Sequence, residues 1–266
     1  MLPALNELSR EQSKPTEETR KKAHRLMDYA ATYPNTYLRY HASSMILNVD
    51  SDAAYLVQPQ AKSRIAGYFH LSNLPTPTQH PTVNGAILVE CKTLRHVVAS
   101  AAEAETAGVI HNAQMAIPIR TILNTLGHIQ PPTPLKTDNF TTSGFIHINI
   151  HLRKAKSWDM RYHWLRDKEA QQCFKFFWEK GTKNHADYYT KHHPTSHHKS
   201  IRKTYVMDKL NIISEKIMQL DKTYVLQGCV ISPMTSSLHH TTYDVINTSF
   251  IDYYENQYTD KITDMD

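Results

Sequence analysis

The chain has 266 residues, of which 40% are hydrophobic, so it is long enough for one good-sized domain with extensions or for two small domains. No run approaches the roughly 18–20 apolar residues that cross a bilayer, and the first thirty residues lack the apolar core of a signal peptide. Three scattered cysteines without a CxxC pair exclude a zinc ribbon and a disulfide framework. We therefore expect a cytoplasmic or nuclear protein that is not secreted and has no membrane partner.

Charge is distributed unevenly along the chain. Residues 41–205 hold 19 Lys and Arg against 11 Asp and Glu, whereas residues 206–266 hold 4 against 9. A basic body is typical of proteins that bind a polyanion, although many soluble domains are mildly basic. The acidic end of the chain has a different composition from the part before it.

In chain order, the first predicted element is a helical stretch interrupted at Pro15. The last is a helix-like segment before Pro194. Ser100 has the spacing of a capping box with Glu103, and Pro118 is placed to start a second helix. The expected helices are 4–32, 100–115, 117–126, 157–168 and 185–191. The expected strands are 45–52, 63–71, 86–93, 135–138 and 173–178. Hairpin strands followed by crossover helices indicate an α/β layer with a mixed sheet.

Acidic residues stand at strand ends and helix starts, where loops and clefts form in α/β sheets. Magnesium prefers oxygen ligands and is usually held by a few carboxylates, water and substrate phosphate. Two such ions can activate a water and stabilise the leaving oxygen of a phosphodiester. Each acid alone is more often a solvated surface residue, so the argument depends on the set. The positions are Asp50 and Asp52, Glu103 and Glu105, Asp138, and Asp187.

Six short motifs, in order and over roughly residues 41–195, resemble the ribonuclease H domain of copia-type LTR retrotransposon Pol polyproteins. They are Ser51-Asp52-Ala53, 63–69 (SRIAGYF), 100–105 (SAAEAE), Thr137-Asp138-Asn139, 159–164 (DMRYHW) and 186–191 (ADYYTK). No Tyr-x-Asp-Asp motif occurs, so we expect the polymerase part to be absent from this chain. The resemblance implies a ribonuclease H-like mixed five-stranded sheet flanked by helices.

The resemblance also implies a domain organisation. Residues 1–40 look like the helical connector between reverse transcriptase and ribonuclease H, and residues 41–205 would form the ribonuclease H-like domain. Residues 206–266 would be an acidic, weakly structured and partly disordered C-terminal extension.

By the same resemblance, Asp52, Glu105, Asp138 and Asp187 would be the catalytic residues and the ligands of two Mg²⁺ ions, with Mn²⁺ as an alternative metal. Asp50 and Asp52 share a strand face, so geometry does not choose between them; the family's Ser-Asp-Ala triplet falls on Asp52. Glu103 and Glu105 lie about 200° apart on a helix. Since Glu103 has the capping position, Glu105 is favoured for the metal.

Four further residues are candidates for accessory roles: Asp50, His185, Asp159 and His163. His185 could ferry protons or help product leave, and Asp159 and His163, one helical turn apart, could bind metal or phosphate. Local hydrogen bonding or a solvated face is the commoner explanation for each. The histidine doublets at 192–193 and 197–198 lack a cysteine partner, so we expect no zinc site there.

These observations lead to two hypotheses. The first is a ribonuclease H-type hydrolase, an endonuclease that cuts the RNA strand of RNA–DNA hybrids, with a reverse transcriptase from another element as a second candidate partner. The second is a catalytically inactive retrotransposon relic that at most binds nucleic acid. The hybrid would be read by groove shape and 2′-hydroxyls rather than by base sequence.

Overall fold

The computed structural model describes residues 1–74, 82–140 and 156–207, all within one compact unit, Met1–Asn211. Its strands are β1 (Ile46–Gln58), β2 (Lys62–Ser72), β3 (Ala86–Thr93), β4 (Thr133–Thr137) and β5 (Phe174–Trp178). Its helices are α1 (Leu2–Glu11), α2 (Glu17–Thr32), α3 (Ala101–Thr125), α5 (Lys156–Ala170) and α6 (Thr195–Tyr205), with 3₁₀ turns η1 (Gly181–Lys183) and η2 (Asp187–Tyr189). The expected C-terminal extension lies, apart from residues 206 and 207, outside the described residues.

The five strands form one mixed sheet in the order β3-β2-β1-β4-β5. The first three strands pair antiparallel, while β4 runs parallel to β1 and β5 runs parallel to β4. This confirms the predicted mixed five-stranded sheet flanked by helices. Strand β1 is longer than expected because its hairpin with β2 continues to the pair Gln58↔Lys62.

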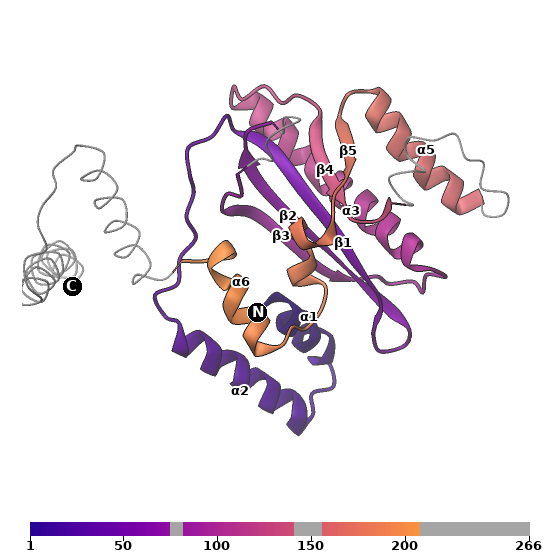
Figure 1. Cartoon of the computed structure of the whole chain (residues 1–266). Helices are drawn as coiled ribbons and strands as arrows, with labels where there is room; N and C mark the ends of the chain where they lie inside the picture. The colour runs from indigo at the N-terminus through magenta and orange to yellow at the C-terminus, as the bar shows by residue number, and fades with distance from the viewer. Residues whose placement is uncertain (75–81, 141–155, 208–266) are drawn as a thin grey trace, which may run out of the picture. The chain divides into compact units, whose positions relative to one another are not determined.

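Side chains alternate across the strands, so the sheet has two covered faces. Figure 1 shows α3 and α5 on one side and α1, α2 and α6 on the other. The core beneath α3 and α5 includes Leu47, Val49, Phe69, Val109, Leu165 and Phe176. The opposite core includes Ala66, Tyr68, Ala186 and Tyr189, with Leu2 and Tyr205 packed against it.

The prediction of two helices meeting at Pro118 is wrong, because α3 runs through this proline without a break. Proline has no N–H and so removes one helical hydrogen bond. Burial of residues before and after Pro118 offsets the lost hydrogen bond, since Ala113, Ala116 and Leu123 all lie in the core beneath the helix. Packing against the sheet therefore overrides the local stop signal.

The predicted helical segment at 185–191 is also wrong in kind, since only the short 3₁₀ turn η2 forms there. Tyr189 is buried against the sheet, and the Thr190 hydroxyl bonds to Asp52, 2.6 Å away. These contacts compete with regular helix formation. The last described helix, α6, instead begins after Pro194, and its Arg202 guanidinium lies 4.1 Å from the centroid of the Tyr33 ring.

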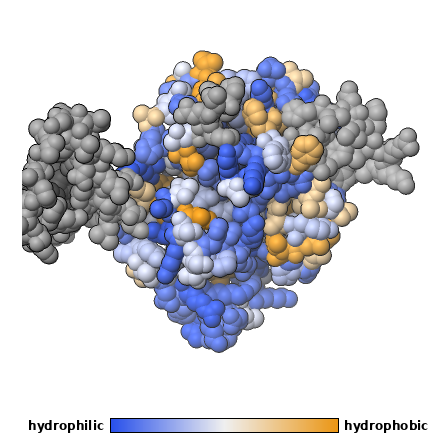
Figure 2. Space-filling view, in the orientation of Figure 1, coloured by the Kyte–Doolittle hydropathy of each residue, from blue (hydrophilic) through white to orange (hydrophobic). Residues whose placement is uncertain are grey.

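The face shown in Figure 2 is mostly hydrophilic, with its hydrophobic residues in small separate groups. Within the part of the chain that the structure describes, none of the helices combines the length and apolar character that a membrane span requires.

At Gly67, strand β2 lies against the Asn112 side chain of helix α3. The buried Asn112 amide donates to the Ser51 hydroxyl and to the Ala66 carbonyl, each at 2.8 Å. A Cβ at Gly67 would lie 2.3 Å from Asn112 Oδ1. At Gly108, on α3, a Cβ would have its nearest neighbour at 3.4 Å, which is ordinary contact.

These two glycines form a matched pair for a stability test. We expect Gly67→Ala to lower the free energy of unfolding by about 1–3 kcal/mol, because it overpacks the core and displaces Asn112. Gly108→Ala should be neutral or stabilise by up to about 1 kcal/mol, through helix propensity. Urea denaturation of both variants measures the difference. Equal destabilisation by the two would contradict this packing account.

Candidate active site

Three carboxylates converge at one end of the sheet. Asp52, Glu105 and Asp138 each place one oxygen within 4.8 Å of the oxygens of the other two. The parallel pairing of β1 with β4 ends at Ser51↔Thr137, and the next residues on the two strands are Asp52 and Asp138. The end of this parallel ladder therefore holds two acids side by side, and Glu105 joins them from α3.

Helix α3 brings Glu105 into the cluster and keeps Glu103 out of it. Glu105 is 6% exposed, and its Oε1 accepts a hydrogen bond from the Ala53 amide at 3.1 Å. Its Oε2 is buried without a hydrogen-bond partner. Glu103 instead accepts from the Ala99 amide, while its own amide donates to the Ser100 hydroxyl. Glu103 thus serves the helix start, and Glu105 faces the other acids.

Asp187 stands next to the three clustered carboxylates, in η2. It lies near enough to raise the pKa of Asp52, Glu105 and Asp138 electrostatically, and its Oδ1 is 2.5 Å from the Lys191 ammonium. The segment is tied to β1 because the Asn184 amide donates to the Ser51 carbonyl at 2.8 Å. The structure thus brings Asp52, Glu105 and Asp138 together, and it places Asp187 in the segment that reaches this group through the Thr190 hydroxyl.

The electrostatics of the cluster favour protons or cations. Burial, helped by the charges of Asp138 and Asp187 and opposed by the Thr190 hydrogen bond, raises the pKa of Asp52 to about 7. Burial, together with Asp52 and Asp138, holds the pKa of Glu105 well above its usual range. Burial and Asp187 likewise raise the pKa of Asp138. One Glu105 oxygen has no hydrogen-bond partner, and the carboxylates repel one another. Both features fit a site for a divalent cation, which prefers oxygen ligands.

Asp50 has a different environment, although it shares the strand face of Asp52. It is fully buried, with His185 Nδ1 at 2.6 Å and the Lys136 ammonium at 3.3 Å. Burial alone would raise its pKa, but the His185 hydrogen bond and the Lys136 charge hold that pKa below the usual range. Asp50 and His185 therefore pair with each other, and neither belongs to the group of three carboxylates.

The other accessory candidates lie on α5. His163 is exposed on this helix, and the side chain of Asp159 lies outside the described part of the structure. Three residues around the site were not predicted: Thr190, which bonds to Asp52; Lys191, which pairs with Asp187; and Asn184, which bonds to the Ser51 carbonyl. The i, i+4 spacing of Asp187 and Lys191 was a usable signal.

A basic groove of about 440 Å³ lies between the end of β3 and helices α3 and α5. None of the four acids lines it, and Ala107, which does, projects from a different face of α3 than Glu105. Its ionisable lining residues are all basic: Lys92, Arg95, His96, His111 and Arg161. Such a lining is complementary to a phosphate backbone.

No family model matches the chain, and no curated protein matches its sequence. Among solved structures, it is similar to the N-terminal RNase H domain of a Mycobacterium tuberculosis protein, at 10% identity and a TM-score of 0.40 over 55% of this chain and 91% of that one. It is similar to RNase H1 from Halobacterium salinarum at 12% identity and a TM-score of 0.37, over 54% of this chain and 93% of that one. It is also similar to LC11-RNase H1 in complex with an RNA/DNA hybrid, at 9% identity and a TM-score of 0.38, over 54% of this chain and 92% of that one. At these identities, the case for a function rests on the residues of the site itself.

Proposed function

We propose that this chain is a divalent-metal-dependent endonuclease of the ribonuclease H type, which hydrolyses the RNA strand of RNA–DNA hybrids. The observation that carries the proposal is the meeting of Asp52, Glu105 and Asp138, from β1, α3 and the end of β4, with Asp187 beside them. A structural role alone does not explain why a fold would bury acids that repel one another. Metal-assisted phosphodiester hydrolysis requires such a group.

The four carboxylates would divide the work of holding two Mg²⁺ ions, with Mn²⁺ as the alternative. Asp52 and Asp138 would anchor both ions, and Glu105 and Asp187 would complete the two ligand sets. When bound, the ions would supply an activated water and a counter-charge for the leaving oxygen. The Thr190 hydroxyl fixes the orientation of the Asp52 carboxylate, and Ala53 does the same for Glu105 through its amide.

The partner proposed here is an RNA–DNA hybrid. The basic groove beside α3 would neutralise phosphates of the duplex. Recognition through phosphates and groove shape implies cleavage with little sequence preference. One of the similar solved structures is itself a complex with an RNA/DNA hybrid.

The copia-type retrotransposon origin is part of the same proposal and is supported by the six ordered motifs between residues 51 and 191. With this origin we propose a cytoplasmic or nuclear location and a helical connector at residues 1–40. We also propose that a reverse transcriptase from another element is a partner that strengthens binding of the hybrid.

Two glutamates on the first turns of α3 provide an activity test. We expect Glu105→Gln to lower the rate of hybrid cleavage in Mg²⁺ by at least about a hundredfold, because it removes a metal ligand. Glu103→Gln, the matched control, should leave the rate within about twofold, since the cap contributes only to stability. Cleavage of a labelled hybrid measures both. Cleavage that survives Glu105→Gln would contradict the mechanism, and hybrid binding without turnover in Mg²⁺ or Mn²⁺ would favour the inactive relic.

The raised pKa of Asp52 gives a second test, on stability. The pKa is about 7 in the folded, metal-free protein and near 4 in the unfolded chain. Between these values the folded state holds the extra proton, so this group makes stability fall as pH rises through the window.

Asp52→Asn removes the buried charge at nearly constant shape. In EDTA at pH 8, its free energy of unfolding should exceed that of the unmodified protein by on the order of a few kcal/mol, and the difference should shrink toward pH 4.5. Mg²⁺ should stabilise the unmodified protein more than the variant. Urea denaturation gives these values, and a variant less stable at pH 8 would refute the idea of an uncompensated carboxylate cluster.

A further inference from the structure

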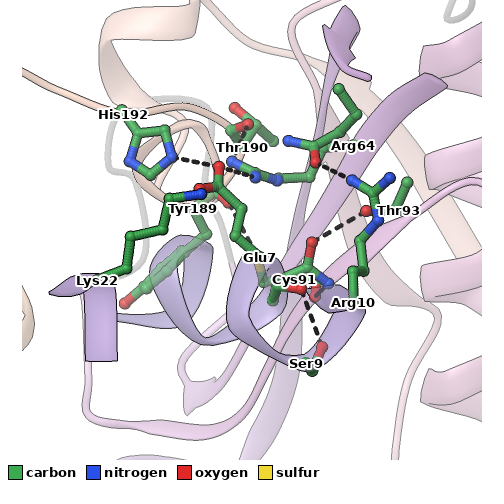
Figure 3. A network of polar contacts seen from close by, with 12 residues as sticks. Glu7, Ser9, Arg10, Lys22, Arg64, Cys91, Thr93, Tyr189, Thr190 and His192 are labelled. Atoms are coloured by element: carbon green, nitrogen blue, oxygen red, sulfur yellow. Dashed lines mark hydrogen bonds and ion pairs between the residues drawn. The ribbon is translucent and has the colours of Figure 1, made fainter. Parts of the chain in front are cut away.

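Helix α1 is anchored at the edge of the sheet by polar side chains. The Asn6 side chain donates to the Cys91 carbonyl at 3.3 Å and accepts from the Thr93 hydroxyl at 2.9 Å, both on β3. Arg10 donates to Gln58 at the end of β1, at 2.5 Å. Figure 3 shows Arg10, Cys91 and Thr93 where the helix meets the strands. This docking directs Glu7 of the same helix toward β2.

Glu7 pairs with the buried Arg64 of β2. The Arg64 side chain is 1% exposed, and its Nη2 lies 3.2 Å from Glu7 Oε1. Its Nη1 donates to the Thr190 carbonyl, also at 3.2 Å. A buried guanidinium requires a counter-charge and partners for its donors. Glu7 supplies the charge, and the backbone after η2 supplies the acceptor.

The same Glu7 oxygen also contacts the segment that carries Asp187. His192 Nε2 lies 2.6 Å from Glu7 Oε1, so Glu7 is bonded to His192 directly and to Thr190 through Arg64 (Figure 3). Two residues of a short segment are thereby fixed from a helix near the N-terminus.

The fixed segment faces the carboxylates on its other side. The Thr190 hydroxyl donates to Asp52 Oδ2 at 2.6 Å, and the Lys191 ammonium lies 2.5 Å from Asp187 Oδ1. A continuous chain of contacts therefore runs from Glu7 through Arg64 and Thr190 to Asp52.

We propose that α1 is a working part of the site and that Glu7 is a positioning residue for it. Through Arg64 and His192, Glu7 holds the segment 187–192 so that Thr190 orients Asp52 and Asp187 stays beside the cluster. This inference rests on the proposed function, because Glu7 would position the same residues that are proposed to bind the metal ions. The connector at 1–40 would then act on the chemistry rather than only link two domains.

The test uses the full chain and compares three single variants. Glu7→Ala removes the contact, and Glu7→Gln keeps an acceptor for Arg64 while removing the charge. Glu18→Ala is the control, because Glu18 is an exposed carboxylate on α2 and its loss changes net charge equally. Thr190→Val, alone and combined with Glu7→Ala, removes the hydroxyl that reaches Asp52.

Two readouts avoid any dependence on cleavage: amide hydrogen exchange of residues 187–193 without metal, and the dissociation constant for Mn²⁺ by calorimetry. Glu7→Ala should speed exchange in this segment and weaken Mn²⁺ binding by about tenfold, the usual effect of losing a group that orients a ligand. Glu7→Gln should fall between Glu7→Ala and the unmodified protein, and Glu18→Ala should behave like the unmodified protein. In the Thr190→Val background, Glu7→Ala should weaken Mn²⁺ binding less than it does alone, because part of its effect acts through the Thr190 hydroxyl.

Unchanged exchange at 187–193 in Glu7→Ala would overturn the inference, and so would losses of Mn²⁺ affinity that simply add in the double variant. A chain that shows the expected exchange and Mn²⁺ pattern but cuts no hybrid would overturn the proposed function while leaving this positioning role in place.

Discussion

The structure depends on holding like charges together at the point where β1 and β4 stop pairing. Asp52 and Asp138 follow the last paired residues of the parallel ladder, and Glu105 completes a group whose oxygens lie within 4.8 Å of one another. In water such a group would disperse. Here the sheet and α3 hold the carboxylates together in the folded chain. Their mutual repulsion lowers the free energy of unfolding, and a bound cation would offset that repulsion.

The contrast with Asp50 shows how the same sheet treats an acid that has no such role. Asp50 lies two residues from Asp52 on the same strand face, but it pairs with the Lys136 ammonium and is hydrogen-bonded to His185. Its pKa is held low, whereas the pKa of Asp52 is raised. A carboxylate compensated within the fold stabilises the protein at neutral pH, whereas one left uncompensated destabilises it. The difference between two neighbouring acids therefore separates a structural group from a candidate ligand.

Much of the fold follows from local patterns, but its exceptions have tertiary causes. All five strands were located from the sequence, most of them through apolar residues bounded by turn signals, although the full length of β1 was not predicted. The continuity of α3 through Pro118 was not, since it depends on burial against the sheet. The four acids could be selected from their places at element ends and from the motif series. The path from Glu7 to Asp52 joins residues far apart in sequence and only becomes visible once α1 is docked.

The measurement that tests the central claim most directly is anomalous diffraction from crystals of the full chain soaked in Mn²⁺. The account predicts two peaks bounded by the carboxyl groups of Asp52, Glu105, Asp138 and Asp187, with Asp50 still bonded to His185. Crystals that show Mn²⁺ elsewhere, or these four side chains turned away from a common centre, would contradict it.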